Sequence, residues 1–188
     1  MNLQAWLFFL DESGFSAVSP LKRTWAPRGE TPTQYTRLDH HDRLNLIGGL
    51  GVTPARRKIR LHLQAHGRSI TGEEVKRFLT HLLQQIPGPI VLVWDQHPIH
   101  RRTSVQEFIE AHSRLQVYEF PTSAPELNPA EMVWTQITEY VAGTAPHDTT
   151  ELYDIVYAAV ARTRRSRHRL WACIHASKLP WTRSSLEH

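Results

Sequence analysis

Two aspartates of this sequence each follow a short apolar run of the kind that forms a buried strand. Asp11 comes directly after residues 7–10, and Asp95 comes directly after residues 90–94. Ligand sites in open α/β sheets tend to form at strand ends, so two neighbouring strands would place these carboxylates side by side. Adjacent carboxylates repel each other, and a hard divalent cation, which prefers oxygen ligands, relieves that repulsion. The two positions therefore indicate a metal site at one edge of a sheet.

Glu131 is a third candidate for the same site. It occupies the third position of a helix that is predicted to begin at Asn128-Pro129, because Asn is a good N-cap and Pro suits the first helical position. The pattern Asn-x-x-Glu also resembles a capping box, in which the Glu side chain reaches back to the N-cap amide. The residues alone leave both interpretations open, and the two other acids at strand ends favour a role in the site.

The elements that must position these acids follow from hydrophobic periodicity and from capping signals. Strands are predicted at residues 4–10, 44–52, 59–65, 90–94 and 115–120, with two more short strands at 16–19 and 23–26. Helices are predicted to begin at the capping box of Thr71 and Glu74, near Ser104, at Asn128 and near Glu151. Early antiparallel pairing and later βαβ crossovers imply a mixed sheet with helices on both faces, in a three-layer α/β domain.

The composition is that of one globular domain. The chain has 188 residues, of which 40% are hydrophobic and 21% are charged. Its single cysteine excludes an internal disulfide and a cysteine-based zinc site. No apolar run approaches the ~20 residues that a membrane helix needs. The net charge of +4 is compatible with a polyanionic partner.

Three short segments carry the candidate acids: residues 9–14 (FLDESG), 93–100 (VWDQHPIH) and 125–134 (PELNPAEMVW). Together they resemble the DDE signature of mariner-like transposases, and most closely that of the bacterial insertion-sequence branch. Positions 95 and 131 leave 35 residues between them, a spacing typical of that branch. The third segment is the most specific of the three, and the resemblance extends over residues 5–165.

The resemblance implies a ribonuclease-H-like catalytic domain that uses two Mg²⁺ or Mn²⁺ ions, with Asp11 touching both ions and Asp95 and Glu131 one each. Two such ions can activate the attacking oxygen and stabilise the leaving oxygen of an in-line displacement at phosphorus. The implied reaction is cleavage of DNA at transposon ends, followed by attack of the freed 3′-OH on target DNA. The implied partner is double-stranded DNA bound by a homodimer in the bacterial cytoplasm, where the nucleoid lies, with no membrane involved.

Residues next to the acids receive supporting roles. By the resemblance, we expect Asn128 and Pro129 to position Glu131 without binding metal. Glu12 would be a fourth acid near the metals or would point to the opposite face of the sheet. We favour the second alternative, because successive residues of a strand alternate between faces.

Two histidines that follow Asp95 and two groups of arginines, one just past the Asp95 loop and one near the C-terminus, are candidates for DNA contacts. His97 would donate to a phosphate or hold the Asp95 loop, unless His97 and His100 are both solvent-facing loop histidines. The cations that we expect to contact phosphates are Arg101, Arg102, Arg162, Arg164 and Arg165. A solvated helix face is the alternative for the last three.

We expect residues 1–185 to form one catalytic domain and residues 186–188 to be a tag remnant. Transposases of this group carry an N-terminal helix-turn-helix region, and this sequence begins one strand before Asp11, so we expect that region to be absent from it. Two alternatives stay open: a ribonuclease-H-type nuclease without strand transfer, and an inactive domesticated DNA-binding module. An ATPase is disfavoured, because none of the nine glycines begins a phosphate-loop pattern.

Overall fold

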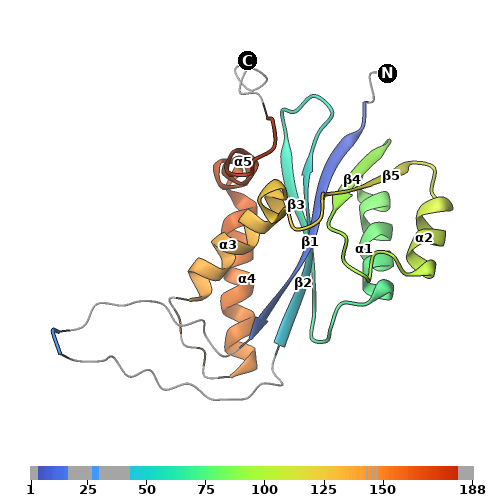
Figure 1. Ribbon diagram of the computed structural model, residues 1–188. Helices are drawn as coiled ribbons and strands as arrows, with labels where there is room; N and C mark the ends of the chain where they lie inside the picture. Colours follow the sequence, from blue (N-terminus) through green and yellow to red (C-terminus); the bar gives the residue numbers. More distant parts are fainter. Residues whose placement is uncertain are drawn as a thin grey trace.

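The protein folds as one mixed β-sheet between two layers of helices, as seen in a computed structural model (Figure 1). The structure describes residues 4–16, 27–29, 43–142, 144, 146 and 148–181. The short strands predicted at 16–19 and 23–26 and the tag remnant at 186–188 lie outside these residues, apart from Ser16. Among the described residues, no helix is long and apolar enough to cross a membrane.

The sheet has five strands in the order β3-β2-β1-β4-β5. Their bounds are β1 Trp6–Ser16, β2 Arg43–Val52, β3 Ile59–His66, β4 Ile90–Trp94 and β5 Leu115–Glu119. The pairs β1–β2 and β2–β3 are antiparallel, while β1–β4 and β4–β5 are parallel. The predicted mixed sheet is therefore confirmed, with β1 as its central strand.

Strand β1 is longer than the sequence predicts, and this corrects the position of Asp11. The strand does not end at Leu10 but continues through Asp11 to Ser16, because β2 pairs with it along that whole length. On its other side β1 pairs with β4 only as far as Phe9, which faces Val93. Extending that register by two residues brings Asp11 level with Asp95. The two acids therefore meet where β4 ends beside a central strand that continues.

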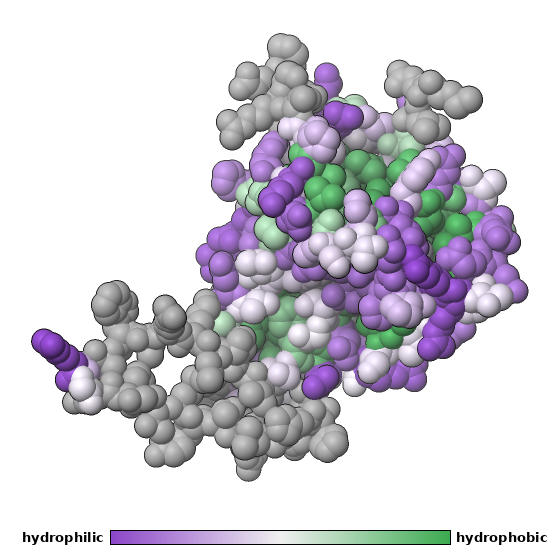
Figure 2. Space-filling model, in the orientation of Figure 1, coloured by the Kyte–Doolittle hydropathy of each residue, from purple (hydrophilic) through white to green (hydrophobic). Residues whose placement is uncertain are grey.

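The helices cover the two faces of the sheet and bury two separate cores (Figure 1). Helices α1 (Gly72–Gln85) and α2 (Thr103–Glu110) pack on one face, against side chains such as Phe8, Leu10 and Ile47. Helices α3 (Pro129–Val141), α4 (Thr149–Arg165) and α5 (Arg167–Ala176) pack on the other, against Phe9 and Phe15. Alternate residues of β1 thus enter opposite cores, as the period of a strand requires. Hydrophilic side chains predominate on the surface drawn in Figure 2, with apolar ones gathered in patches between them.

Local capping explains where the helices begin. The predicted capping box of Thr71 and Glu74 is present at α1. The prediction of a single C-terminal helix is wrong, because this segment forms two helices, α4 and α5. Ser166 separates the two, and its side chain accepts a hydrogen bond from the amide of Arg169 at 3.3 Å, which caps α5.

Candidate active site

The three predicted acids line one cavity of about 260 Å³. Asp11 comes from the middle of β1, Asp95 follows the last residue of β4, and Glu131 lies in the first turn of α3. The other lining residues come from the Asp95 loop and from the segment between β5 and α3: Gln96, His97, Phe120, Pro121, Thr122, Ser123, Ala124, Pro125 and Asn128. The fold therefore brings together three carboxylates that are far apart in the sequence.

Asp11 is the most deeply placed of the three acids, with 7% of its surface exposed. Burial and the nearby carboxylates of Glu131, Glu12 and Asp95 raise the pKa of Asp11 to about 8. One donor opposes this shift, since the indole N–H of Trp134 donates to Oδ2 of Asp11 at 2.9 Å. The carboxyl group is therefore oriented by the protein, while its surroundings disfavour its ionised form.

A glycine makes room for the indole that orients Asp11. The cross-strand partner of Asp11 on β2 is Gly48. A Cβ at Gly48 would lie 2.7 Å from Cη2 of Trp134, so any side chain there would displace the ring. The bare backbone of β2 thus allows a residue of α3 to reach the carboxylate of β1.

Asp95 has the opposite electrostatic character, and 51% of its side chain is exposed. The backbone amide of His97 donates to Oδ1 of Asp95 at 3.0 Å, and Nδ1 of His100 lies 3.2 Å from the same oxygen. The hydrogen bond from His100 is the largest effect on the pKa of Asp95 and lowers it. Burial opposes this shift, and the hydrogen bond from the His97 amide adds to it, so that the pKa of Asp95 is lowered on balance. The pKa values of the two neighbouring acids are therefore shifted in opposite directions, that of Asp95 downward and that of Asp11 upward.

Glu131 faces the cavity and does not close a capping box. The backbone amide of Asn128 donates to the carbonyl of Pro125 at 2.9 Å, so it is already used. The side-chain Oδ1 of Asn128 accepts from the amide of Ala130, and its Nδ2 donates to the carbonyl of Leu10 at 3.2 Å. Asn128 thereby fastens the start of α3 to β1, next to Asp11. Burial, and then the charge of Asp95, raise the pKa of Glu131.

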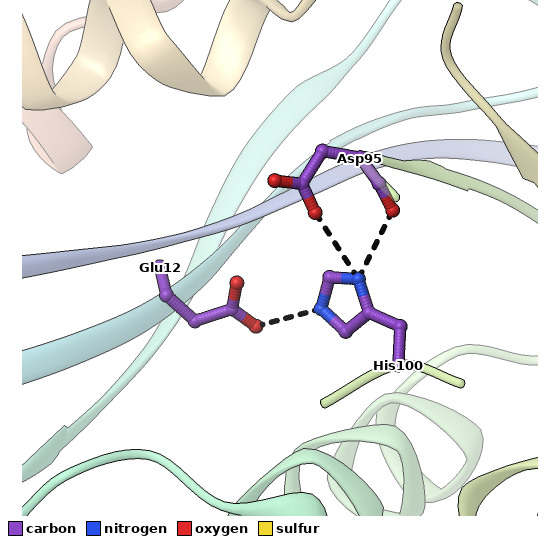
Figure 3. A group of neighbouring side chains, drawn as sticks. All are labelled: Glu12, Asp95 and His100. Atoms are coloured by element: carbon purple, nitrogen blue, oxygen red, sulfur yellow. Dashed lines mark hydrogen bonds and ion pairs between the residues drawn. The ribbon is translucent and has the colours of Figure 1, made fainter. Parts of the chain in front are cut away.

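Glu12 and His100 join the site in a way that the sequence did not reveal. Glu12 faces the α1–α2 layer, as predicted, because its cross-strand partner Ile47 lies in that core. Its Oε1 nevertheless lies 3.1 Å from Nε2 of His100, whose Nδ1 contacts Asp95 (Figure 3). His100 is fully buried, so the alternative of a solvent-facing histidine is wrong for this residue. Burial works to lower the pKa of His100, but hydrogen bonds to Asp95 and Glu12 raise it to about 10.

His97 is exposed at the rim of the cavity. Its Nδ1 accepts a hydrogen bond from the amide of Ile99 at 3.3 Å. In the neutral ring, Nε2 therefore carries the proton and is a potential donor. His97 is therefore a solvent-exposed loop histidine, and its backbone amide, not its ring, contacts Asp95.

The predicted arginines do not form one group. Arg101 pairs with Glu119 at 2.9 Å and donates to Gln96 of the cavity wall at 2.8 Å. Arg102 is exposed and directly precedes α2. Away from the cavity, Arg162 lies over the ring of Tyr140 at 5.6 Å.

The other two predicted arginines, Arg164 and Arg165, are exposed at the end of α4. In that place they lie close to a second basic stretch of the sequence, residues 56–60. Arg167, at the start of α5, donates to the carbonyl of Arg57 in the β2–β3 turn at 2.9 Å. Two basic stretches that are distant in the sequence therefore meet at one corner of the molecule.

The fold and the acids define a class, that of ribonuclease-H-like phosphoryl-transfer enzymes. The sequence model of the family described as DDE superfamily endonuclease matches residues 6–152, and the chain belongs to that family. The assignment to the bacterial insertion-sequence branch stays a prediction. No curated protein matches the chain in sequence.

Solved structures agree in fold. The Mos1 strand transfer complex is similar with a TM-score of 0.65 and 16% identity, over 90% of this chain and 50% of that chain. The mariner Mos1 paired end complex with Mg is similar with a TM-score of 0.64 and 17% identity, over 90% of this chain and 51% of that chain. An intasome of simian T-cell lymphotropic virus in complex with PP2A regulatory subunit B56 gamma is similar with a TM-score of 0.51 and 12% identity, over 95% of this chain and 57% of that chain. The chain thus spans about half the length of the solved chains that it resembles.

Proposed function

We propose that this chain is the catalytic domain of a DNA transposase, comprising residues 1–185. It would cut DNA at transposon ends in a metal-dependent reaction and join the freed 3′-OH to target DNA. The observation that carries the proposal is the convergence of Asp11, Asp95 and Glu131 on one cavity. The family match and the similarity in fold to two mariner complexes support it.

The donor set of the cavity suits a hard divalent cation. Its charged ligands are three carboxylates, and oxygen is the ligand atom that Mg²⁺ and Mn²⁺ prefer. Burial and the acidic neighbours raise the pKa of Asp11, which means that they disfavour its ionised form. A bound cation would favour the ionised form and so offset both effects. Asp11 would touch two ions, and Asp95 and Glu131 one each. When bound, the ions would activate the attacking oxygen and stabilise the leaving oxygen.

The side chains of this protein would hold the reacting groups in line. In the first step, the oxygen of water bonds to phosphorus and the P–O3′ bond breaks, leaving a 3′-OH and a 5′-phosphate. In the second step, that 3′-OH oxygen bonds to a target phosphorus, and the target's P–O3′ bond breaks in turn. His97 would donate its Nε2 proton to a phosphate oxygen, while Asn128 and Pro129 keep Glu131 in place. No covalent bond to the protein forms in either step.

The corner where the two basic stretches meet would contact DNA phosphates. Its exposed cations are Arg56, Arg57, Lys58, Arg60, Arg164, Arg165 and Arg167. Within the part of the chain that the structure describes, none of them forms an ion pair with a carboxylate. Val52 at the β2–β3 turn pairs with Leu7, four residues before Asp11 and thus ~13 Å away along β1. That separation corresponds to about four nucleotide steps at ~3.4 Å each.

The salt dependence of DNA binding tests this corner. Each lost phosphate contact should make the slope of log affinity against log salt less negative by about 0.9. We expect a change of about 2 for Arg57→Gln with Arg167→Gln, and none for Arg77→Gln, a cation that pairs with Glu74. An unaltered slope in the double variant would exclude the corner from the DNA contact.

By the resemblance to mariner-like transposases, we also propose that the protein binds DNA as a homodimer.

The catalytic proposal is tested by metal binding together with cleavage and joining. We would titrate Mn²⁺ by calorimetry and follow nicking of supercoiled plasmid DNA, with Asp95→Ala and Glu131→Gln as variants. Glu107→Gln, on the exposed side of α2, is the matched control. Joining is assayed with pre-cut duplexes that end in 3′-OH or in 3′-deoxy nucleotides.

The outcomes separate the alternatives. Nicking that requires Asp95 and Glu131, together with joining that requires the same acids and a 3′-OH, would support a transposase. Nicking without joining would favour a ribonuclease-H-type nuclease. Mn²⁺ binding that Asp95→Ala and Glu131→Gln leave unchanged would overturn the site and favour an inactive DNA-binding module.

A further inference from the structure

We infer that Glu12 and His100 act as a positioning pair for Asp95: through His100, Glu12 fixes which oxygen of Asp95 is available to a cation. The inference rests on the proposed function, in which Asp95 holds a metal ion. Neither residue would touch DNA or metal, and both would act through the carboxylate of Asp95.

Asp95 needs such support because the sheet does not hold it. The ladder of β4 ends at Trp94, which faces Glu119 of β5, and the pairing with β1 ends one residue earlier, at Val93. Asp95 therefore begins a loop, and half of its side chain is exposed. A carboxylate in such a place rotates freely unless other groups bind it.

His100 supplies that support at two points of Asp95. Its Nδ1 lies 3.2 Å from Oδ1 of Asp95 and 3.1 Å from the backbone carbonyl of the same residue (Figure 3). The amide of His97 donates to Oδ1 as well. Oδ2, in contrast, accepts no hydrogen bond from any residue in the described part of the chain. One oxygen of Asp95 is thus committed to the protein, and the other is left for a ligand in the cavity.

Three further contacts hold His100 in place. Its ring stacks on Trp94 with centroids 4.1 Å apart and planes 6° from parallel. Its carbonyl accepts a hydrogen bond from Nε2 of Gln106 at 2.7 Å. Its remaining ring nitrogen, Nε2, contacts Glu12, which lies within the central strand β1. The loop of Asp95 is thereby anchored to the same strand that carries Asp11.

This anchoring explains why Glu12 belongs to the site although it faces the other side of the sheet. Asp11 and Glu12 are consecutive, so β1 presents one carboxylate directly to the cavity and uses the next to hold Asp95. The positions of Asp11 and Asp95, whose carboxylates would hold the metal, would then both depend on strand β1. Loss of a group that orients a metal ligand typically costs 10–100-fold in metal affinity or activity.

The test compares Glu12→Ala, Glu12→Gln and the exposed control Glu107→Ala. Glu12 is the residue to change, because it is 17% exposed, whereas His100 is fully buried. We expect Glu12→Ala to weaken Mn²⁺ binding at least tenfold by calorimetry and to lower kcat for plasmid nicking, with KM for DNA unchanged. Glu12→Gln, whose amide oxygen can still accept from Nε2, should fall between Glu12→Ala and the wild type. Glu107→Ala should leave all three quantities at wild-type values.

Two results would overturn the inference. Mn²⁺ affinity and kcat within twofold of wild type in Glu12→Ala, in a protein that circular dichroism shows to be folded, would remove the positioning role. Loss of one bound Mn²⁺ per chain with the remaining affinity unchanged would make Glu12, Asp95 and His100 a ligand cluster instead, since their ligand atoms lie within 4.8 Å of one another. If Asp95→Ala also binds Mn²⁺ like wild type, the proposed function fails as well, so the two failures are distinguishable.

Discussion

Replacing Asp11 by Asn should stabilise the metal-free protein at alkaline pH. Asp11 is buried next to Glu131, Glu12 and Asp95, which together with burial raise its pKa from 3.8 to about 8. A folded-state pKa above the unfolded value means that the stability contribution is fully present below about pH 4 and is lost as pH rises through 8. In wild type, ionising this carboxyl group in its buried place therefore works against folding at pH 8.

The magnitude follows from the size of the shift. Four pKa units correspond to roughly 5 kcal/mol of free energy. Asn still buries a polar amide, which costs about 1–3 kcal/mol, although its Oδ1 can accept from Trp134 as Asp11 does. We expect a net gain of about 2 kcal/mol, or a rise of about 4–8 °C in Tm.

Thermal unfolding in EDTA, measured from pH 4 to pH 8.5, tests this expectation. At pH 4, where Asp11 is protonated, only the cost of the buried amide remains, so the variant should be less stable than wild type. The difference in Tm should rise with pH and favour the variant above pH 8, while Mn²⁺ should stabilise wild type more than the variant. Asp154→Asn, at an exposed position of α4, is the matched control. An Asp11→Asn protein that is less stable than wild type in EDTA at pH 8 would refute the electrostatic reasoning.

Three further predictions concern Trp134, Asn128 and Arg102, the last two each compared with a second variant. Trp134→Phe removes the indole donor of a hydrogen bond to a carboxylate, worth about 1.5–3 kcal/mol, and calorimetry should show Mn²⁺ affinity falling by about one order of magnitude or more. Asn128→Ala and Asp148→Ala each remove an N-cap, so each should lower the free energy of unfolding, measured in urea, by about 1 kcal/mol. Only Asn128→Ala should also reduce nicking. Equal nicking activity in the two variants would deny Asn128 a role in the site. Arg102→Ala should weaken DNA binding and flatten its salt dependence more than Arg101→Ala, because Arg101 is already paired with a carboxylate; the reverse order in a salt titration would contradict this.

The sequence alone determined the features that depend on neighbours along the chain. The capping box that begins α1 is a contact between residues three apart, so Thr71 and Glu74 predict it directly. The continuous apolar run of residues 90–94 predicts a strand buried within a sheet. The structure agrees, since β4 lies between β1 and β5. The three acids could also be chosen, since each has a recognisable local setting and the segments that carry them resemble a known signature.

Only the tertiary structure decided what surrounds each acid. Strand β1 passes through Asp11 because β2 happens to pair that far, and Trp134 reaches Asp11 only because Gly48 lies opposite it. His100 is buried because Trp94 and Glu12 enclose it, and Glu12 lies 88 positions away in the sequence. Periodicity and capping report on contacts within a turn or a strand, whereas these contacts depend on which strands become neighbours and in which register. The meeting of the three acids in one cavity was therefore predictable, but the shifts in their pKa and the residues that orient them were not.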